Sequence, residues 1–357
     1  MMFFKNKPVT DIGAAPEIEH DGLNLAMHES FCDFEKIKGM IPTALSNVYE
    51  MYVLDTNQTT AQKTAVLEGV LSDAWEKIRS FFKKIAEKLK SWWNAAVKYF
   101  QTIFSSNESF LKKFKEDISG KDGSKFSYTG YEFKGTGAAE VTAAAKKSNE
   151  SSKKAFDEMV KLASGDLQKA KDESSDKVKE KKKEIDKIWM GLVKKGADTG
   201  NVSKFKEALE KGILGGEKKE IIGFSKGLSV SQMIDLLENG GDTLSELKDI
   251  ANDISENADK YADEVDSMVG KFRQGEEDAT KRSNYSNLIT AASTVAKYDL
   301  SYATAAVDVV KATLSEKISQ SSSVLRSFAR YKEPTKDSYT PSTGNKTSML
   351  EAFAGGW

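Results

Sequence analysis

The sequence predicts an all-α fold, an elongated multi-helix bundle with long coiled-coil-like helices and one small β-hairpin. Its five prolines all lie before residue 43 or after residue 333, and proline costs about 3 kcal/mol inside a helix. Apolar residues recur with alternating steps of three and four in two long segments, as in heptads. Apolar residues make up 39% of the chain and charged residues 30%, which favours thin helical packing over a thick globular core.

The N-terminal part is expected to form an irregular arm, residues 1–20, and a helical domain, residues 21–118. Short helices are predicted within 21–65 and one long helix within 66–104. The heptad positions of the long helix are Leu71, Trp75, Ile78, Phe82, Ile85, Leu89, Trp92, Ala96, Tyr99 and Ile103. Because heptad positions share one stripe of a helix, we expect those from Trp75 to Ala96 to be buried together. The lysines off this stripe are expected to be exposed, namely Lys77, Lys84, Lys88 and Lys98.

The middle of the chain is expected to hold a β-hairpin insertion, residues 119–135, followed by helices over 138–240. Aromatic residues flank Thr129-Gly130, which predicts that both strands lie within 125–134 and rest on a helix surface. Residues 138–195 are predicted to form one long Lys/Glu-rich helix, or two that meet near Gly165, before Gly-containing connector helices. A capping box, Ser229 to Gln232, predicts the start of a helix that stops after Asn239.

The C-terminal part is expected to be a helical hairpin, residues 242–331, followed by a polar tail, residues 332–357. A second capping box, Thr243 to Glu246, predicts the start of a heptad helix over 242–272. An Ala-rich helical pattern follows from about residue 285 to residue 330. The tail ends in an apolar tip formed by Met349, Leu350, Phe353 and Trp357.

Charge is divided unevenly along a chain whose formal net charge is only −1. Residues 74–118 contain ten Lys/Arg and five Asp/Glu, for a net charge of +5, whereas residues 242–278 contain four and twelve, for −8. These two segments are therefore expected to complement each other as neighbours in the bundle. The lysine run 177–183 is interleaved with acidic residues, so we interpret it as a solvated helix face with local ion pairs.

Few residues are available for catalysis or metal binding. The chain has one cysteine, Cys32, and two histidines, His20 and His28, so an internal disulfide, a Cys/His metal site and a Ser-His-Asp triad are all disfavoured. We therefore expect no enzyme activity, no metal and no cofactor. The balanced charge also argues against specific nucleic-acid recognition.

The aromatic and lysine-rich helix, residues 74–104, is the strongest candidate for an interaction surface. Its candidate residues for helix packing or membrane contact are Trp75, Ile78, Phe82, Ile85, Leu89, Trp92, Trp93 and Phe100. A basic amphipathic helix with tryptophans is typical of membrane-surface helices. The strict heptad spacing instead favours an ordinary bundle helix whose stripe is core.

The segment AWEKIRSFFKKIAEKLKSWWNAAVKYF, the long Ala/Lys/Glu helices and the polar tails together resemble the internal head or ejected structural proteins of large tailed bacteriophages. The resemblance is compositional and covers mainly residues 65–200. It implies a non-enzymatic virion protein inside or against the capsid, present in many copies, with other virion proteins or copies of itself as partners. It also implies maturation by a protease at Ala15-Pro-Glu17 and Ala138-Ala-Glu140, so Glu17 and Glu140 are candidate processing residues.

Two other functional classes remain open from the sequence. The first is an α-helical pore-forming or lytic protein, membrane-associated through Trp75–Phe104. The second is a secreted helical effector or coiled-coil scaffold. No uncharged apolar run of transmembrane length is present, and the first residues, MMFFKNKPVTDIG, lack the apolar core of a signal peptide. Both features weigh against the pore-forming or lytic alternative.

Overall fold

The structure is a computed structural model, and it describes residues 27, 29–41, 59–133, 137–163, 167–193, 201–224, 226–273 and 279–332. The predicted N-terminal arm and the apolar C-terminal tip lie outside these residues. The labelled elements are α2 (Thr60–Gly120), β1 (Ser127–Gly130), α3 (Ala138–Ala163), α4 (Leu167–Met190), α5 (Val202–Leu214), β2 (Lys219–Ile222), α6 (Val230–Asn239), α7 (Gly241–Arg273) and α8 (Ala279–Arg330). A further helix, residues 29–41, precedes them. The predicted all-α class with one small antiparallel sheet is confirmed.

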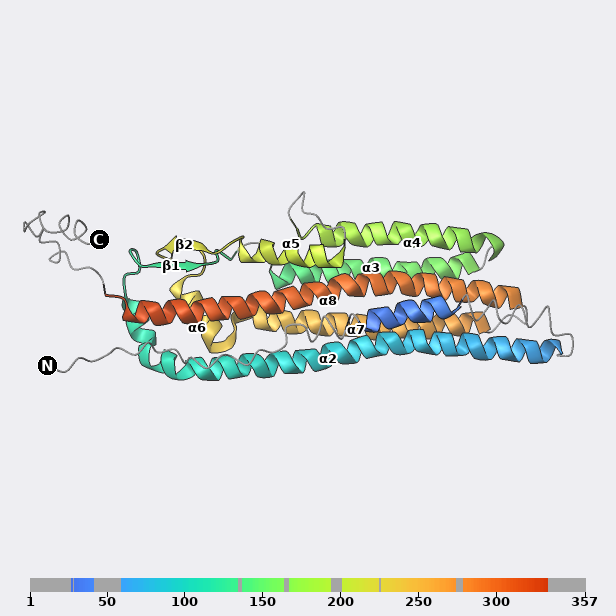
Figure 1. The fold of residues 1–357 in the computed structure, drawn as a ribbon, viewed down its shortest axis with the longest axis horizontal. Helices are drawn as coiled ribbons and strands as arrows, with labels where there is room; N and C mark the ends of the chain where they lie inside the picture. Colours follow the sequence, from blue (N-terminus) through green and yellow to red (C-terminus); the bar gives the residue numbers. More distant parts are fainter. Residues whose placement is uncertain are drawn as a thin grey trace, which may run out of the picture.

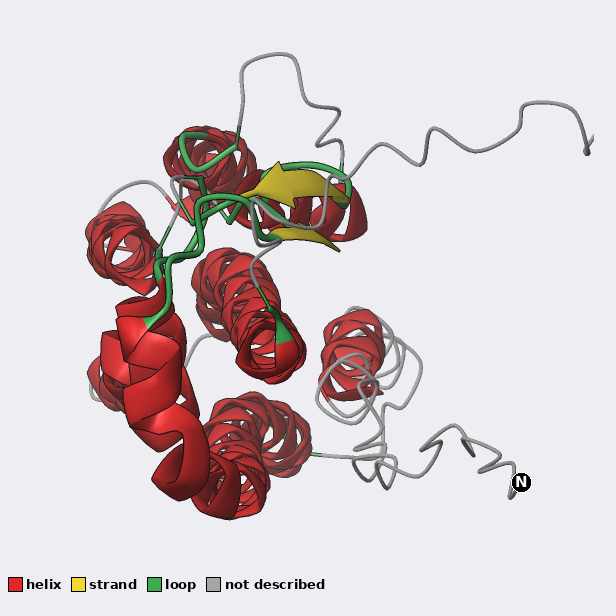
Figure 2. Cartoon of the chain, turned by 90° about the vertical axis from the view of Figure 1, so that its left-hand side faces the viewer, coloured by secondary structure: helices red, strands yellow, loops and turns green. Residues whose placement is uncertain are grey.

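The helices form an elongated bundle (Figure 1). In this view α2 lies along one side, α3, α4 and α5 along the other, and α7 and α8 between them. Viewed along its length, the bundle has helices arranged around a central one (Figure 2). This agrees with the contacts of α8, which packs against every other labelled helix. The described body is therefore built around α8, the last of the labelled helices.

Helix α8 can occupy the centre because its middle turns carry mainly small or apolar residues. Every residue from 302 to 311 is buried, and this stretch consists mainly of alanine and valine. An amphipathic helix leaves one face in water, whereas a helix that is apolar all round needs neighbours on every side. The charged residues within this stretch, Asp308 and Lys311, are buried as well.

Helix α2 has 61 residues, so at 1.5 Å per residue it is about 90 Å long. Its start at Thr60 is fixed by a capping box, in which the Gln62 N–H donates to the Thr59 hydroxyl and the Thr59 N–H donates to the Gln62 side chain. The predicted helix within 66–104 is therefore part of a longer one. Just after α2, the Lys121 ammonium donates to the carbonyl of Ala329 at 2.5 Å and so caps the end of α8.

The segment 138–195 forms two helices, α3 and α4, which pack against each other. This is the second of the two arrangements that the sequence predicted. The capping box at Ser229 is also confirmed, with Ser229 at the N-cap of α6. The box at Thr243 is wrong, because α7 already begins at Gly241, directly after the left-handed Gly240 that ends α6. Thr243 therefore lies inside the first turn of α7.

The sheet differs from the predicted local hairpin. Strand β1 pairs with β2, so the second strand lies far beyond the predicted segment 125–134. Gly130 indicated a turn in the sequence, but a Cβ atom there would lie 2.6 Å from the Gln320 side chain. The glycine is thus required by close approach to α8 rather than by a tight turn. The sheet lies at one end of the bundle (Figure 1), where Phe126 packs on Phe328 of α8 with ring centroids 5.0 Å apart.

Candidate functional site

The predicted interaction face of α2 is directed into the bundle. Six of its eight residues are buried: Trp75, Ile78, Phe82, Ile85, Leu89 and Phe100. Ala96 is buried with them. Trp92 and Trp93 are only partly buried, so the expectation of full burial was wrong for Trp92. The face therefore supplies core to the folded chain.

The four lysines expected to be exposed are not equally so. Lys84 and Lys98 are exposed, whereas Lys77 and Lys88 are half-buried. The ammonium group of Lys77 binds Asp73 at 2.6 Å, and that of Lys88 donates to the Ser30 hydroxyl at 2.6 Å. These contacts cover the two side chains.

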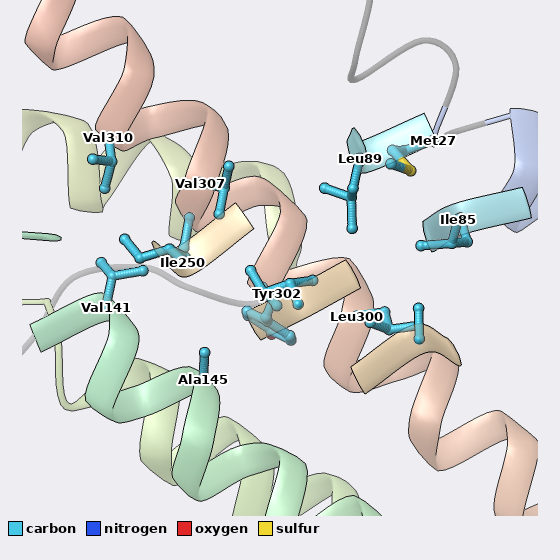
Figure 3. Close-up of a cluster of buried hydrophobic side chains, with 14 of the residues drawn as sticks. Met27, Ile85, Leu89, Val141, Ala145, Ile250, Leu300, Tyr302, Val307 and Val310 are labelled. Carbon is cyan, nitrogen blue, oxygen red and sulfur yellow. The ribbon is translucent and has the colours of Figure 1, made fainter. Parts of the chain in front are cut away.

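The face of α2 meets α7, α8 and the helix 29–41. The rings of Phe82 and Tyr261 of α7 lie 5.7 Å apart, and those of Phe81 and Phe34 lie 4.9 Å apart. Figure 3 shows Met27, Ile85 and Leu89 gathered on one side of α8. Aromatic pairs at such distances add about 0.5–1.5 kcal/mol each beyond the area that they bury. The aromatic richness of α2 is thus used to hold several helices together.

The expected complementarity of the basic and acidic segments is confirmed between α2 and α7. Arg79 binds Asp266 at 2.7 Å, and Lys90 binds Asp259 at 3.2 Å. The two helices also approach closely, since the Ser255 hydroxyl donates to the Ala86 carbonyl at 3.2 Å. Exposed ion pairs of this kind contribute about 0.2–1 kcal/mol each, so their main effect is on pairing and register.

A buried polar cluster around Asp299 was missed by the sequence analysis. Asp299 lies on α8 and is 3% exposed. Its carboxylate accepts hydrogen bonds from the Tyr261 hydroxyl of α7 at 2.9 Å and from the Trp189 indole of α4 at 3.4 Å. Both donors are themselves fully buried. One carboxyl group thus joins three helices through neutral donors.

The environment of Asp299 shifts its protonation. Burial raises the pKa of Asp299 above the ordinary carboxyl range, although hydrogen bonds to the carboxylate, including those from Tyr261 and Trp189, act in the opposite direction. The pKa of Tyr261 is raised well above its usual value, first by burial and second by the charge of Asp299. Because these groups are closed to solvent, the main effect of the arrangement is to fix helix register.

Other polar contacts between helices add to this register. The amide of Asn149 on α3 donates to Asn257 on α7 at 2.8 Å. Asn107 on α2 accepts from Ser322 at 2.9 Å and from Arg326 at 3.1 Å, both on α8. A buried polar pair forms in one register only, because a shift leaves both partners unsatisfied. In the sequence, these contacts could have been predicted only from single polar residues that interrupt an apolar stripe.

The lysine run of α4 is only partly the solvated face that was expected. Lys177 and Lys179 form local ion pairs with Glu180 and Asp176. Lys181 is buried instead, and it binds Glu158 of α3 at 3.1 Å. This lysine therefore joins the two helices of the α3–α4 pair, and the expectation was wrong at this position.

The two candidate processing residues fall in different places. Glu17 lies outside the described residues. Glu140 is exposed in the first turn of α3, and its carboxylate accepts a hydrogen bond from the Gly137 N–H at 2.7 Å. This contact stabilises the helix start, so a protease would need to unwind that turn. Processing at both residues stays a prediction.

No helix within the described ranges is both long and apolar enough to cross a bilayer. Within the same ranges, no three His, Cys, Asp or Glu residues are grouped so as to hold a metal ion.

No family model, curated protein or solved structure matches this chain. The likeness to phage head proteins thus depends on the composition of residues 65–200.

Proposed function

We propose that this protein is a non-enzymatic structural protein of a bacteriophage virion, an internal head or capsid-associated protein present in many copies. The observation that carries the proposal is the rod-like body, in which α2 and α8, with 61 and 52 residues, run along one bundle. Such a body offers long lateral surfaces for packing against neighbours. The compositional resemblance supplies the phage assignment.

The buried polar contacts support a structural role because they fix the helices in one arrangement. The polar contacts of Asn107, Asn149 and Asp299 each join different helices across the core. Contacts of this kind restrict sliding of one helix along another. A protein that packs in many identical copies needs such a uniform shape.

The membrane-active alternative would require α2 to leave the bundle. That step would expose Phe82, Ile85 and Leu89, which are fully buried. Fully burying a large apolar side chain is worth about 1.5–3 kcal/mol. Opening the bundle is therefore costly, and this cost favours the structural proposal.

The proposal is tested on particles produced by the genome that encodes this chain. After purification and a high-salt wash, quantitative mass spectrometry should find many copies per particle relative to the major capsid protein. Peptides beginning at Ile18 or Val141 would show processing after Glu17 or Glu140. Absence of the chain from washed particles would contradict the proposal. Dye release from anionic liposomes by the purified protein would instead support the membrane-active alternative.

A further inference from the structure

The helix 29–41 occupies an apolar groove between α2 and α8. Phe34 is fully buried and packs on Phe81 and Phe82 of α2, with ring centroids 4.9 and 6.4 Å away. Met27, which is also helical, is buried near Leu89 (Figure 3). The groove is therefore filled by a short stretch of the chain's own N-terminal part.

Two polar contacts fix how this helix sits in the groove. The Lys88 ammonium of α2 donates to the Ser30 hydroxyl at 2.6 Å, and Lys297 of α8 binds Glu35 at 2.6 Å. The ammonium of Lys297 also lies 5.8 Å from the ring centroid of Phe34. The groove thus recognises both the apolar face and the charge pattern of this helix.

The helix and the groove depend on each other. A helix of 13 residues is marginal in water by itself. Without the helix, the ring of Phe81, which is now buried, would lose the cover of Phe31 and Phe34. Whenever the helix leaves, both surfaces therefore favour binding a matching partner.

The segment that joins helix 29–41 to α2 is long enough for this helix to reach the groove of its own chain or that of another copy. Residues 42–58, a segment of 17 residues, separate the helix from the start of the α2 cap at Thr59. A segment of this length reaches up to about 55–60 Å when fully extended. This reach covers much of the length of α2, so the helix is not restricted to the groove of its own chain.

We infer that helix 29–41 is exchanged between copies, so that the partner of this groove is helix 29–41 of a second copy of the chain. The inference rests on the proposed function, because exchange requires copies at high density. A short tether keeps an attached helix near its own groove at an effective concentration of order mM. When copies are packed at similar concentrations, the helix of a neighbouring copy competes with the tethered helix for the same groove. The exchanged helix is identical, so it makes the same contacts in the groove.

The test uses purified chains in which Cys32, the one cysteine, is replaced by serine. One chain then carries Glu35→Cys and the other Lys297→Cys. The two chains are mixed, incubated at concentrations from about 1 µM to about 1 mM, and treated with a short bismaleimide. Exchange predicts a cross-link between the two chains whose share rises with concentration. A chain carrying both substitutions should cross-link internally at low concentration. A Ser30→Cys and Lys88→Cys pair repeats the test at a second contact.

The matched control pair is Lys115→Cys and Glu238→Cys, which replaces an ion pair between α2 and α6. These helices lie within the bundle, so mixing this pair should give no cross-link between chains. Circular dichroism verifies that each variant is folded. Equal cross-linking of the control pair, or purely internal cross-links at every concentration, would overturn the inference. Since no virion is involved, this result is independent of whether the chain is found in particles.

Discussion

The side-chain amide of Gln320 on α8 pairs with the backbone of Tyr131, just after β1, as a neighbouring strand would. Its Oε1 accepts from the Tyr131 N–H at 2.7 Å, and its Nε2 donates to the Tyr131 carbonyl at 3.0 Å. A carboxamide carries one acceptor and two donors, so it can satisfy both polar groups of a peptide unit. One side chain thus attaches the sheet to the central helix.

Replacement of Gln320 by leucine should lower stability by about 1–3 kcal/mol. The reason is that the N–H and C=O of Tyr131 lose their partner in a half-buried place. Urea unfolding followed by circular dichroism measures the change. The neighbouring exposed Ser319→Ala is the control and should change stability by less than about 0.5 kcal/mol. Equal effects of the two substitutions would contradict the pairing.

Replacement by alanine should change stability in opposite directions at two glycines, Gly240 and Gly270. Gly240 has a φ of 80°, and a Cβ atom there would lie 3.0 Å from Leu244 and Phe104, so Gly240→Ala should cost at least about 1–2 kcal/mol. Gly270 lies within α7 with open space around it, so Gly270→Ala should raise stability by about 0.5–1 kcal/mol. Thermal melts of both variants measure the signs. Destabilisation by Gly270→Ala would show that its site is not open.

Replacement of Leu89 by alanine distinguishes core packing from membrane contact. Leu89 is fully buried, so the change should cost about 2–5 kcal/mol of stability. The matched control is the exposed Lys84→Ala, which should change stability by less than about 0.5 kcal/mol. The membrane-active hypothesis predicts an unchanged melting temperature and weaker co-sedimentation with liposomes, which would count against core packing.

Asp299→Asn should change the pH dependence of stability. The pKa of Asp299 is raised in the folded state, so the folded chain holds this proton at pH values where the unfolded chain, with an ordinary pKa of about 3.9, has released it. Asp299 therefore lowers stability as the pH rises above about 4. Relative to wild type, Asp299→Asn should gain stability between about pH 4 and neutrality. Urea unfolding at several pH values measures this difference, and a constant difference would contradict the raised pKa.

The substitution Tyr261→Phe tests the hydrogen bond that the Tyr261 hydroxyl donates to the Asp299 carboxylate. Tyr261→Phe removes one hydrogen bond from the buried group, and a buried acceptor left without its donor costs about 1–3 kcal/mol. The loss should be larger at neutral pH than near pH 4, because the ionised form depends more strongly on its donors. A loss that does not vary with pH would show that the contact acts through packing alone.

The long helices were predictable because their signals are repetitive. Heptad spacing along α2 and α7 places the buried residues on one stripe, and the opposite charges of the two segments agree with their contacts. The true start of α2 could also have been found, since Thr59 and Gln62 form a capping box three residues apart. Local patterns of this kind do not depend on distant parts of the chain.

The sheet and the buried polar contacts were not predictable in the same way. Strand β1 pairs with residues about ninety positions later, and Gly130 marks a close approach that only the fold defines. Asp299 resembles any surface carboxylate in the sequence, yet it lies where α4, α7 and α8 meet. In each case the contacting residue lies on another helix or strand that is distant in the sequence, and a periodic pattern within one segment does not identify it.

The central position of α8 has a consequence for biosynthesis. Every other labelled helix packs against α8, and α8 follows all of them in the chain. Translation proceeds from the N-terminus, so the segment that completes the core is made last. Until α8 has left the ribosome, the apolar faces of the earlier helices that pack on it stay exposed to solvent. A nascent chain of this kind should depend on chaperones that bind exposed apolar helices, and premature termination before residue 279 should leave a product that aggregates or is degraded.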